Sequence, residues 1–324
     1  MKQDAANAIV VSGLTKYYDG VLAVDGIDFQ VKEGELFGFL GPNGAGKTTT
    51  IRMLTGLSQP SAGAAQVLGH DIKTGITVAK KGFGVVPEVS NLYDELTALE
   101  NLVFAAQLYG IPRDQRIKRA EELLKTFSLF DKKKARFSTL SRGMKRAMTI
   151  AAALIHRPRL LFLDEPTVGL DAVNARSLRS LIQELNHQGV TIFLTTHYLE
   201  EADLLCDRIA LLVHGRIVAL DTPDKLKQMV KMEPACEVHL DHISEEIVKD
   251  LEKQKGIRRV KSSGPNLLLY GESMPLLVES IMQYGSQKGL QIAYISSVKL
   301  SLEDAFIQLT GMNVEVMLTE KGGR

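Results

Sequence analysis

The sequence predicts an α/β fold built on a parallel sheet, followed by a smaller α+β domain. Apolar strand-like runs alternate with stretches of helical periodicity over 36–57 and again over 160–194. A different pattern begins after Pro234. A chain of 324 residues is long enough to form two cores of unequal size.

The first forty residues are typical of short strands separated by turns. Asp19-Gly20 and Glu33-Gly34 supply the turn signals. The strand-like runs lie at 9–11, 21–24, 27–31 and 36–40. The last run leads directly into a glycine-rich loop, and a helix is expected over 47–57.

The middle of the chain is expected to be helical from about 89 to 150. Leu99, Leu102, Val103 and Ala106 recur at helical spacing, and 116–127 has the same period. Strands return at 160–163 and 190–194, and a hairpin is expected at 209–220 around His214-Gly215.

The region after Pro234 predicts the order β-α-β-β-α-β, which is typical of a ferredoxin-like domain. The expected elements are strand 236–240, helix 243–255, strands 258–263 and 267–270, helix 274–287 and strand 291–296, followed by a short helix at 302–309. We therefore expect a first domain at 1–230, an accessory domain at 231–311 and a tail at 312–324.

Composition and charge exclude several classes of protein. Lys plus Arg total 39 against 38 Asp plus Glu, so no nucleic-acid partner is expected. No stretch approaches the roughly 18 uninterrupted apolar residues of a membrane span, and the N-terminus lacks the order of a signal peptide. Cys206 and Cys236 show neither a disulfide framework nor metal-ligand spacing, which favours a reducing cytoplasm.

The segment from Gly41 to Thr48 matches the phosphate-loop pattern G-x-x-x-x-G-K-[ST]. Glycines let successive backbone N–H groups point at a phosphate, and the following helix adds its positive end. Lys47 is expected to reach the β- and γ-phosphates, and the Thr48 hydroxyl to ligate Mg²⁺. The predicted loop contacts to ATP are Gly41, Pro42, Asn43, Gly44, Ala45, Gly46, Lys47, Thr48 and Thr49.

Two adjacent acids, Asp164 and Glu165, follow the apolar strand at 160–163. Strand C-termini are where parallel sheets bind ligands. Asp164 is predicted to hold Mg²⁺ through water, and Glu165 to orient and activate the water that attacks the γ-phosphate. A helix N-cap pair before Pro166-Thr167 is the alternative for these acids taken alone.

Leu140-Ser141-Arg142-Gly143-Met144 begins a helix about twenty residues before those acids. Ser141 could serve only as an N-cap, but a Ser-x-Gly sequence at a helix start is also an anion site.

These motifs together resemble the nucleotide-binding subunit of an ATP-binding cassette (ABC) transporter. The resemblance covers about 8–230 and rests on the loop and acids above, on the Leu140–Met144 segment, on Gly169-Leu170-Asp171 and on Thr195-Thr196-His197. It implies a phosphate-loop NTPase with an antiparallel β subdomain and a helical subdomain. The region around 235–310, with Ser301–Phe306 near its end, is similar to the C-terminal domain of drug-resistance-type ABC-2 exporter ATPases.

The resemblance assigns further roles. It implies a homodimer that sandwiches ATP, in which Ser141 and Gly143 contact the partner's γ-phosphate and Asp171 couples the two sites. His197 would hold the γ-phosphate and the attacking water. Tyr18 matches the aromatic residue that stacks on adenine, with Tyr17 as the alternative.

Three positions depart from the family pattern. Arg142 and Met144 replace the third and fifth residues of the usual Leu-Ser-Gly-Gly-Gln signature, and Arg142 adds a cation near a phosphate. Glu88 stands where the family generally has a glutamine. A glutamate is still a hard oxygen ligand, so we expect Glu88 to contact the metal or its water.

The expected function is an ATPase subunit that powers a separate ABC-2-type permease for export, from the cytoplasmic face of the cell membrane. Residues 89–110 are the expected docking surface. A soluble ABC-type ATPase acting on ribosomes or DNA is the alternative; it usually carries two cassettes or a long coiled-coil insertion, and this chain has neither. A third hypothesis is that the C-terminal domain senses a small ligand. The alternative for this domain, which we favour, is that it stabilises a dimer.

Overall fold

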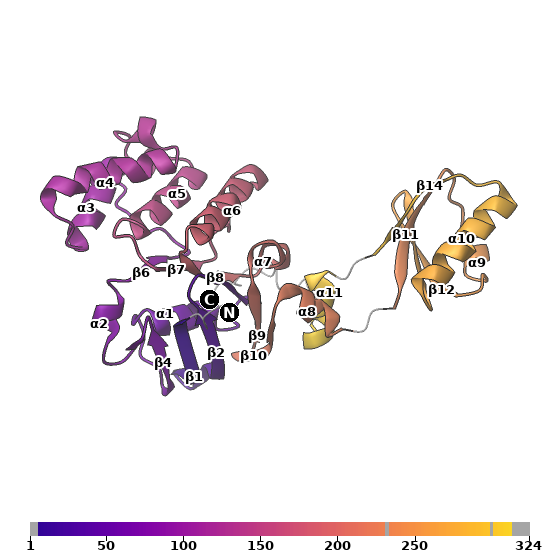
Figure 1. Ribbon diagram of the computed structural model, residues 1–324, viewed down its shortest axis with the longest axis horizontal. Helices are drawn as coiled ribbons and strands as arrows, with labels where there is room; N and C mark the ends of the chain where they lie inside the picture. The colour runs from indigo at the N-terminus through magenta and orange to yellow at the C-terminus, as the bar shows by residue number, and fades with distance from the viewer. Residues whose placement is uncertain (1–5, 231–232, 299–300, 313–324) are drawn as a thin grey trace. The chain divides into compact units, whose positions relative to one another are not determined.

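The computed structural model describes residues 6–230, 233–298 and 301–312. The chain packs as two compact units. The first runs to Leu226 and is rejoined by the chain from Phe306, and the second comprises Lys227–Ala305 (Figure 1). The domain boundaries expected from the sequence stay a prediction, and residues 313–324 of the expected tail lie outside the described part.

The first unit begins with an antiparallel sheet in the order β2-β1-β4-β5. Its strands are β1 (Asn7–Tyr18), β2 (Val21–Lys32), β4 (Ala62–Val67) and β5 (His70–Asp71). The runs expected at 21–24 and 27–31 form one continuous strand. Gly26, at φ +57°, and a shift in register beside it let the strand bend without ending.

A six-stranded sheet forms the centre of this unit in the order β10-β9-β3-β8-β7-β6. Its strands are β3 (Leu36–Leu40), β6 (Phe83–Val86), β7 (Leu160–Asp164), β8 (Thr191–Thr196), β9 (Arg208–Val213) and β10 (Arg216–Asp221). All neighbours pair parallel except the hairpin β9–β10. The carboxyl ends of β3, β7 and β8 therefore meet at one edge.

The two sheets of this unit share an apolar core. Phe29 of β2 lies 5.6 Å from Phe37, 5.5 Å from Phe39 and 5.9 Å from Phe193 between ring centroids. Phe162 adds a fourth ring of the central sheet, 5.6 Å from Phe193. This packing fixes the strands whose ends carry the predicted site residues.

Helices flank the central sheet. They are α1 (Lys47–Leu54), α2 (Ile76–Ala79), α6 (Ala172–His187), α7 (Leu199–Leu205) and α8 (Pro223–Gln228). The sequence predicted α1, and α6 accounts for the helical periodicity noted within 160–194. The other three have four to seven residues, which is too short for a helical period to stand out.

Three helices of 11 to 14 residues pack together beside the sheet: α3 (Ala98–Leu108), α4 (Arg113–Thr126) and α5 (Arg142–Ala153) (Figure 1). Residues 89–97 are not helical, unlike the expectation from the sequence. Thr97 and Glu100 form a capping box that starts α3, and the Asn101 side chain holds the preceding loop through both backbone groups of Tyr93. Polar side chains therefore stop the helix from extending towards Glu88.

The second unit contains β11 (Ala235–Leu240), α9 (Glu245–Leu251), β12 (Ile257–Ser263), β13 (Asn266–Gly271), α10 (Met274–Lys288) and β14 (Ile292–Ser297). Its antiparallel sheet has the order β12-β13-β11-β14. Val238, Leu269 and Ile281 are fully buried in its core. The ferredoxin-like assignment stays our prediction. The last helix is α11 (Leu302–Thr310).

Among the described residues, no helix has both the length and the apolar character needed to cross a bilayer.

Candidate functional site at the carboxyl edge of the central sheet

The loop between β3 and α1 holds a buried lysine. Gly44 and Gly46 adopt positive φ angles, and a Cβ on Gly46 would lie 2.5 Å from the Ala23 carbonyl oxygen. Lys47 is 5% exposed. Its Nζ lies 3.1 Å from the carbonyl oxygen of Pro42 and 3.0 Å from Glu165 Oε1. The loop thus brings an ammonium group and a helix N-terminus to the same point.

Asp164 lies at the end of β7 and faces two hydroxyl groups. Thr195 Oγ1 donates a hydrogen bond of 2.6 Å to Asp164 Oδ1, and Thr48 Oγ1 donates one of 3.3 Å to the same atom. Burial raises the pKa of Asp164; the two hydrogen bonds oppose this rise, and the charges of Glu165 and Glu88 add to it.

Glu165 sits in a conformation that side chains rarely adopt, with φ at +48°. His197 Nδ1 lies 2.8 Å from Glu165 Oε2, and Lys47 occupies the other carboxylate oxygen. Burial alone would raise the pKa of Glu165. The His197 hydrogen bond and the charges of Lys47 and His197 outweigh burial, so the pKa lies below its ordinary value. Glu165 therefore remains an ionised hydrogen-bond acceptor, although Asp164 beside it is shifted the other way.

These groups surround one cavity of about 610 Å³. Its lining combines the glycine-rich loop, the first turn of α1 and the ends of the acidic strands: Ala23, Pro42, Asn43, Gly44, Gly46, Lys47, Thr48, Thr49, Arg52, Glu88, Glu165, Val168, His197 and Tyr198. Glu88 thus reaches the same cavity as Lys47 and Glu165. Gly41 and Ala45 are buried in the loop itself. The size and the cationic floor suit a polyphosphate.

Tyr18 does not line this cavity. It lies 40% exposed at the end of β1, with Lys16 Nζ 4.8 Å from its ring centroid, and Tyr17 is also exposed. The assignment of either ring to adenine remains a prediction.

The Ser141 segment and Asp171 lie outside this cavity and meet each other. Ser141 caps α5 through the Met144 amide at 3.3 Å, and Asp171 caps α6 through the amides of Val173 and Asn174. A Cβ on Gly143 would lie 2.7 Å from Asn174 Oδ1. Since Asn174 Nδ2 also donates to Asp171 Oδ2 at 2.5 Å, Asn174 joins the two segments. Arg142 is exposed at the start of α5, and Met144 is half-buried.

The residues fit a magnesium ion. Mg²⁺ prefers hard oxygen ligands and binds through one or two carboxylates together with substrate phosphates. Thr48 and Asp164 already place a hydroxyl and a carboxylate 3.3 Å apart, and Thr48 and Glu88 line one cavity. Among the described residues no cluster of three or more His, Cys, Asp or Glu could hold a metal ion by itself.

Sequence reasoning missed three residues of this region. Thr195 bonds Asp164, but the sequence pointed to it only as part of the motif Thr195-Thr196-His197. No sequence pattern indicated a role for Asn174. Arg146 was also missed. Its buried guanidinium donates to backbone carbonyls on both sides of the site, and nothing in the local sequence points to partners 18 to 59 residues away.

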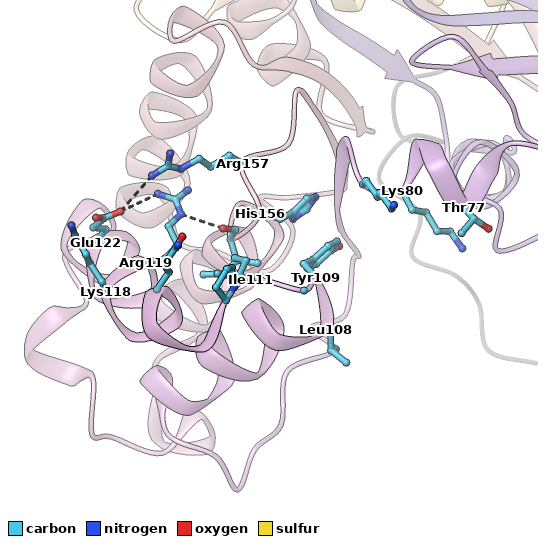
Figure 2. Close-up of a pocket in the computed structure, with 15 residues that line it drawn as sticks. Thr77, Lys80, Leu108, Tyr109, Ile111, Lys118, Arg119, Glu122, His156 and Arg157 are labelled. Atoms are coloured by element: carbon cyan, nitrogen blue, oxygen red, sulfur yellow. Dashed lines mark hydrogen bonds and ion pairs between the residues drawn. The ribbon is translucent and has the colours of Figure 1, made fainter.

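A second and larger cavity, here called the basic pocket, is shown in Figure 2. It adjoins the amino end of β6, where His156 Nε2 lies 3.0 Å from the Phe83 carbonyl oxygen. Its volume is about 1020 Å³. Tyr109 and His156 stack at 3.6 Å between centroids on its floor, and burial lowers the pKa of His156. Its basic and apolar lining includes Lys80, Lys81, Leu108, Ile111, Lys118, Arg119 and Arg157. The one acid in this lining, Glu122, pairs with Arg119 at 3.5 Å and with Arg157 at 3.9 Å.

Comparisons with known proteins agree with the motifs. The family model for the ABC transporter domain matches residues 24–168. The daunorubicin/doxorubicin resistance ATP-binding protein of Streptomyces peucetius is 36% identical over 322 residues, which is 99% of this chain and 98% of that protein. A Nod factor export ATP-binding protein of Rhizobium sp. (strain N33) is 38% identical over 310 residues, 95% of this chain and 98% of its own length.

Comparison with solved structures gives the same result. A structure described as the ATP-binding subunit of an ABC transporter has a TM-score of 0.63 and 33% identity, and covers 68% of this chain and 92% of that one. Phosphate-loop geometry, paired acids and this similarity lead to one conclusion. The chain belongs to the ABC transporter family and is one of its ATP-binding, ATP-hydrolysing subunits.

Proposed function

We propose that this ATPase powers a separate ABC-2-type membrane permease and that the cargo moves outward. The meeting of Lys47, Asp164, Glu165 and His197 at one sheet edge supports the ATPase part of the proposal. Similarity over almost the whole chain to proteins named for drug resistance and Nod factor export supports the direction. We place the subunit at the cytoplasmic face of the membrane.

In this proposal the phosphate loop binds ATP through its backbone amides and Lys47. Glu165 accepts a hydrogen bond from the attacking water and aligns it with the γ-phosphate, and His197 holds the Glu165 carboxylate in place. Thr48, Asp164 and Glu88 would hold Mg²⁺, which supplies neutralising charge for the phosphate oxygens.

We further propose that two copies close around two ATP molecules. The segment Ser141–Met144 would then face the partner's γ-phosphate, and Asp171 would connect the two sites. Support comes from the positions of these residues: both segments start helices, and Asn174, which donates to Asp171 Oδ2, also lies against Gly143.

The permease is proposed to dock beside Glu88, over 89–110. Asn91, Tyr93 and Phe104 line a hollow of about 240 Å³ there, and it shares Leu108 and Tyr109 with the basic pocket. Leu108 is 70% exposed, so an apolar side chain is available to a partner. We propose that the region 231–311, which contains most of the second unit, is an accessory domain that stabilises the dimer.

The test is affinity purification of the Glu165→Gln variant from detergent-solubilised membranes with Mg·ATP, followed by mass spectrometry. The proposal predicts that a polytopic membrane protein co-purifies with this variant. The matched control is Glu165→Gln combined with Lys47→Met, which should not be trapped by ATP. Recovery of ribosomal or DNA-bound proteins without a membrane partner would overturn the permease proposal.

A further inference from the structure

Arg146 connects three parts of the ATPase unit through its guanidinium group. Nε donates to the Pro166 carbonyl oxygen at 2.8 Å and Nη2 to the Asp164 carbonyl oxygen at 2.8 Å. Nη1 donates to the carbonyl oxygens of Pro87 and of Glu88, the latter at 3.2 Å. The side chain therefore ties α5 to the loop after β6 and to the loop after β7.

The group is charged although it is buried. Arg146 is only 9% exposed, and burial lowers its pKa to about 10, against the opposing charges of Asp164, Glu88, Glu201 and Glu165. It thus remains a cation at neutral pH. No ion pair of Arg146 is found in the described part of the chain, and its hydrogen bonds there all go to backbone oxygens. Such bonds fix the path of the main chain rather than the charge of a neighbour.

The carbonyls that Arg146 binds flank the residues of the site. Asp164 and Pro166 precede and follow Glu165 in the chain. Glu165 itself has the strained φ of +48°. A residue in this region of backbone space keeps its conformation only where its surroundings hold it. The Arg146 guanidinium provides that restraint, because it bonds the backbone carbonyls of the residues on both sides of Glu165.

We infer that Arg146 is a positioning residue that holds Glu165 in its productive backbone conformation and links it to the Glu88 loop and to helix α5. This inference rests on the proposed role of Glu165. The segment Ser141–Met144 forms the start of α5. A movement of that helix would therefore be transmitted to Glu165 and Glu88 through the Arg146 side chain.

Lysine at this position separates charge from geometry. Arg146→Lys keeps a buried cation, but the smaller lysine ammonium cannot bond all four carbonyl oxygens that the planar guanidinium reaches. We expect kcat to fall about 10- to 100-fold. The dissociation constant for ATP should change by less than about threefold, since the phosphate loop lies on other elements.

The matched control is Arg208→Lys. Arg208 is also a partly buried arginine that bonds a backbone oxygen, that of Gln30 at 3.2 Å, but it lies at the amino end of β9, opposite the site. It should lose stability without a change in kcat. Melting temperatures of both variants set an assay temperature at which each is folded.

Hydrogen–deuterium exchange gives a second readout that does not depend on turnover. The Glu165 amide donates to the Thr195 carbonyl oxygen at 3.1 Å and should be protected in the wild type. Arg146→Lys should increase exchange over 164–168, and Arg208→Lys should not. Wild-type kcat together with unchanged exchange in Arg146→Lys would overturn the inference. A parallel fall of kcat and ATP affinity would also overturn it, since that indicates a purely structural role. A wild-type protein without ATPase activity would instead refute the proposed function.

Discussion

The two cavities of the ATPase unit lie near opposite ends of β6 and differ in how their charges are held. At the carboxyl end, Lys47 and Glu165 are 5% and 6% exposed and pair with each other at 3.0 Å. In the basic pocket, Arg157 is 75% exposed and its partner Glu122 is 43% exposed. The first site is built from buried, mutually fixed groups, and the second from solvated charges around an apolar floor.

The difference indicates two kinds of recognition. Buried charges are costly to desolvate, so they persist where chemistry needs them preorganised. Exposed cations contribute little to stability, but they steer a partner of opposite charge. The contrast fits nucleotide chemistry in the first cavity, and the basic pocket adjoins the surface at 89–110 that we propose for docking, through Leu108 and Tyr109.

The largest expected effect comes from breaking the buried pair. Lys47→Met removes the cation from the phosphate loop and leaves Glu165 without it. We expect ATP binding to weaken by about 30-fold or more, because the charge-assisted hydrogen bonds from Lys47 to phosphate, worth roughly 2 kcal/mol or more, are lost. Titration calorimetry with Mg·ATP measures this.

The same change should lower the stability of the nucleotide-free protein, and the cycle with Glu165→Gln tests the pairing. If the pair is coupled, Lys47→Met should destabilise the Glu165→Gln protein less than the wild type. Equal losses in denaturant unfolding would show that the pair is not coupled.

A smaller effect is expected at the basic pocket. The double variant Lys80→Glu and Lys118→Glu should weaken association with the permease by about tenfold at low salt, because reversed rim charges slow the encounter. The control is Lys132→Glu and Lys134→Glu, two exposed lysines outside the pocket. Association with reconstituted permease is measured against salt. Equal effects of the two pairs would remove the docking assignment.

The smallest effect concerns pH. The Thr195 hydroxyl lowers the pKa of Asp164, which burial raises, so Thr195→Val should raise that pKa further. Asp164 must be ionised to hold a metal, and the acid limb of ATPase activity should therefore move towards neutral pH. Thr191→Val, at the amino end of the same strand, is the control and should leave the limb in place. A pH–rate profile decides.

Stability should respond with the opposite sign at the two acids. The raised pKa of Asp164 means that protonation favours the fold, and its unfavourable contribution is relieved as pH falls through the folded pKa. The lowered pKa of Glu165 means a favourable contribution above its unfolded pKa, lost as pH falls through the folded pKa. As pH falls, ATPase activity should therefore be lost at a higher pH than the stabilising contribution of Glu165 is lost.

The sequence was sufficient for local structure that immediate neighbours in the chain decide. The apolar run at 160–163 predicted a buried parallel strand, and the contiguous pattern around Lys47 predicted the strand, loop and helix that the structure has there. The phosphate-binding role of this loop stays a prediction. Comparison with relatives confirms the family and the ATPase fold.

The sequence was insufficient where long-range contacts decide the structure. The sequence predicted helix over 89–97, but a capping box and the Asn101 side chain make the helix begin only at Ala98. Arg146 looked like one basic residue among several, and only the fold brings its four carbonyls together. The opposite pKa shifts of Asp164 and Glu165 also depend on Thr195 and His197, which lie 31 and 32 residues away.

The most direct test of the central claim compares Glu165→Gln with wild type in Mg·ATP. The control is Glu200→Gln, an exposed glutamate on α7. Phosphate release, ATP binding and the size of the ATP-bound species are measured together. We predict that turnover falls by about 100-fold or more while ATP binding persists and a dimer accumulates. Turnover equal to that of the wild type would contradict the assignment of hydrolysis to Glu165.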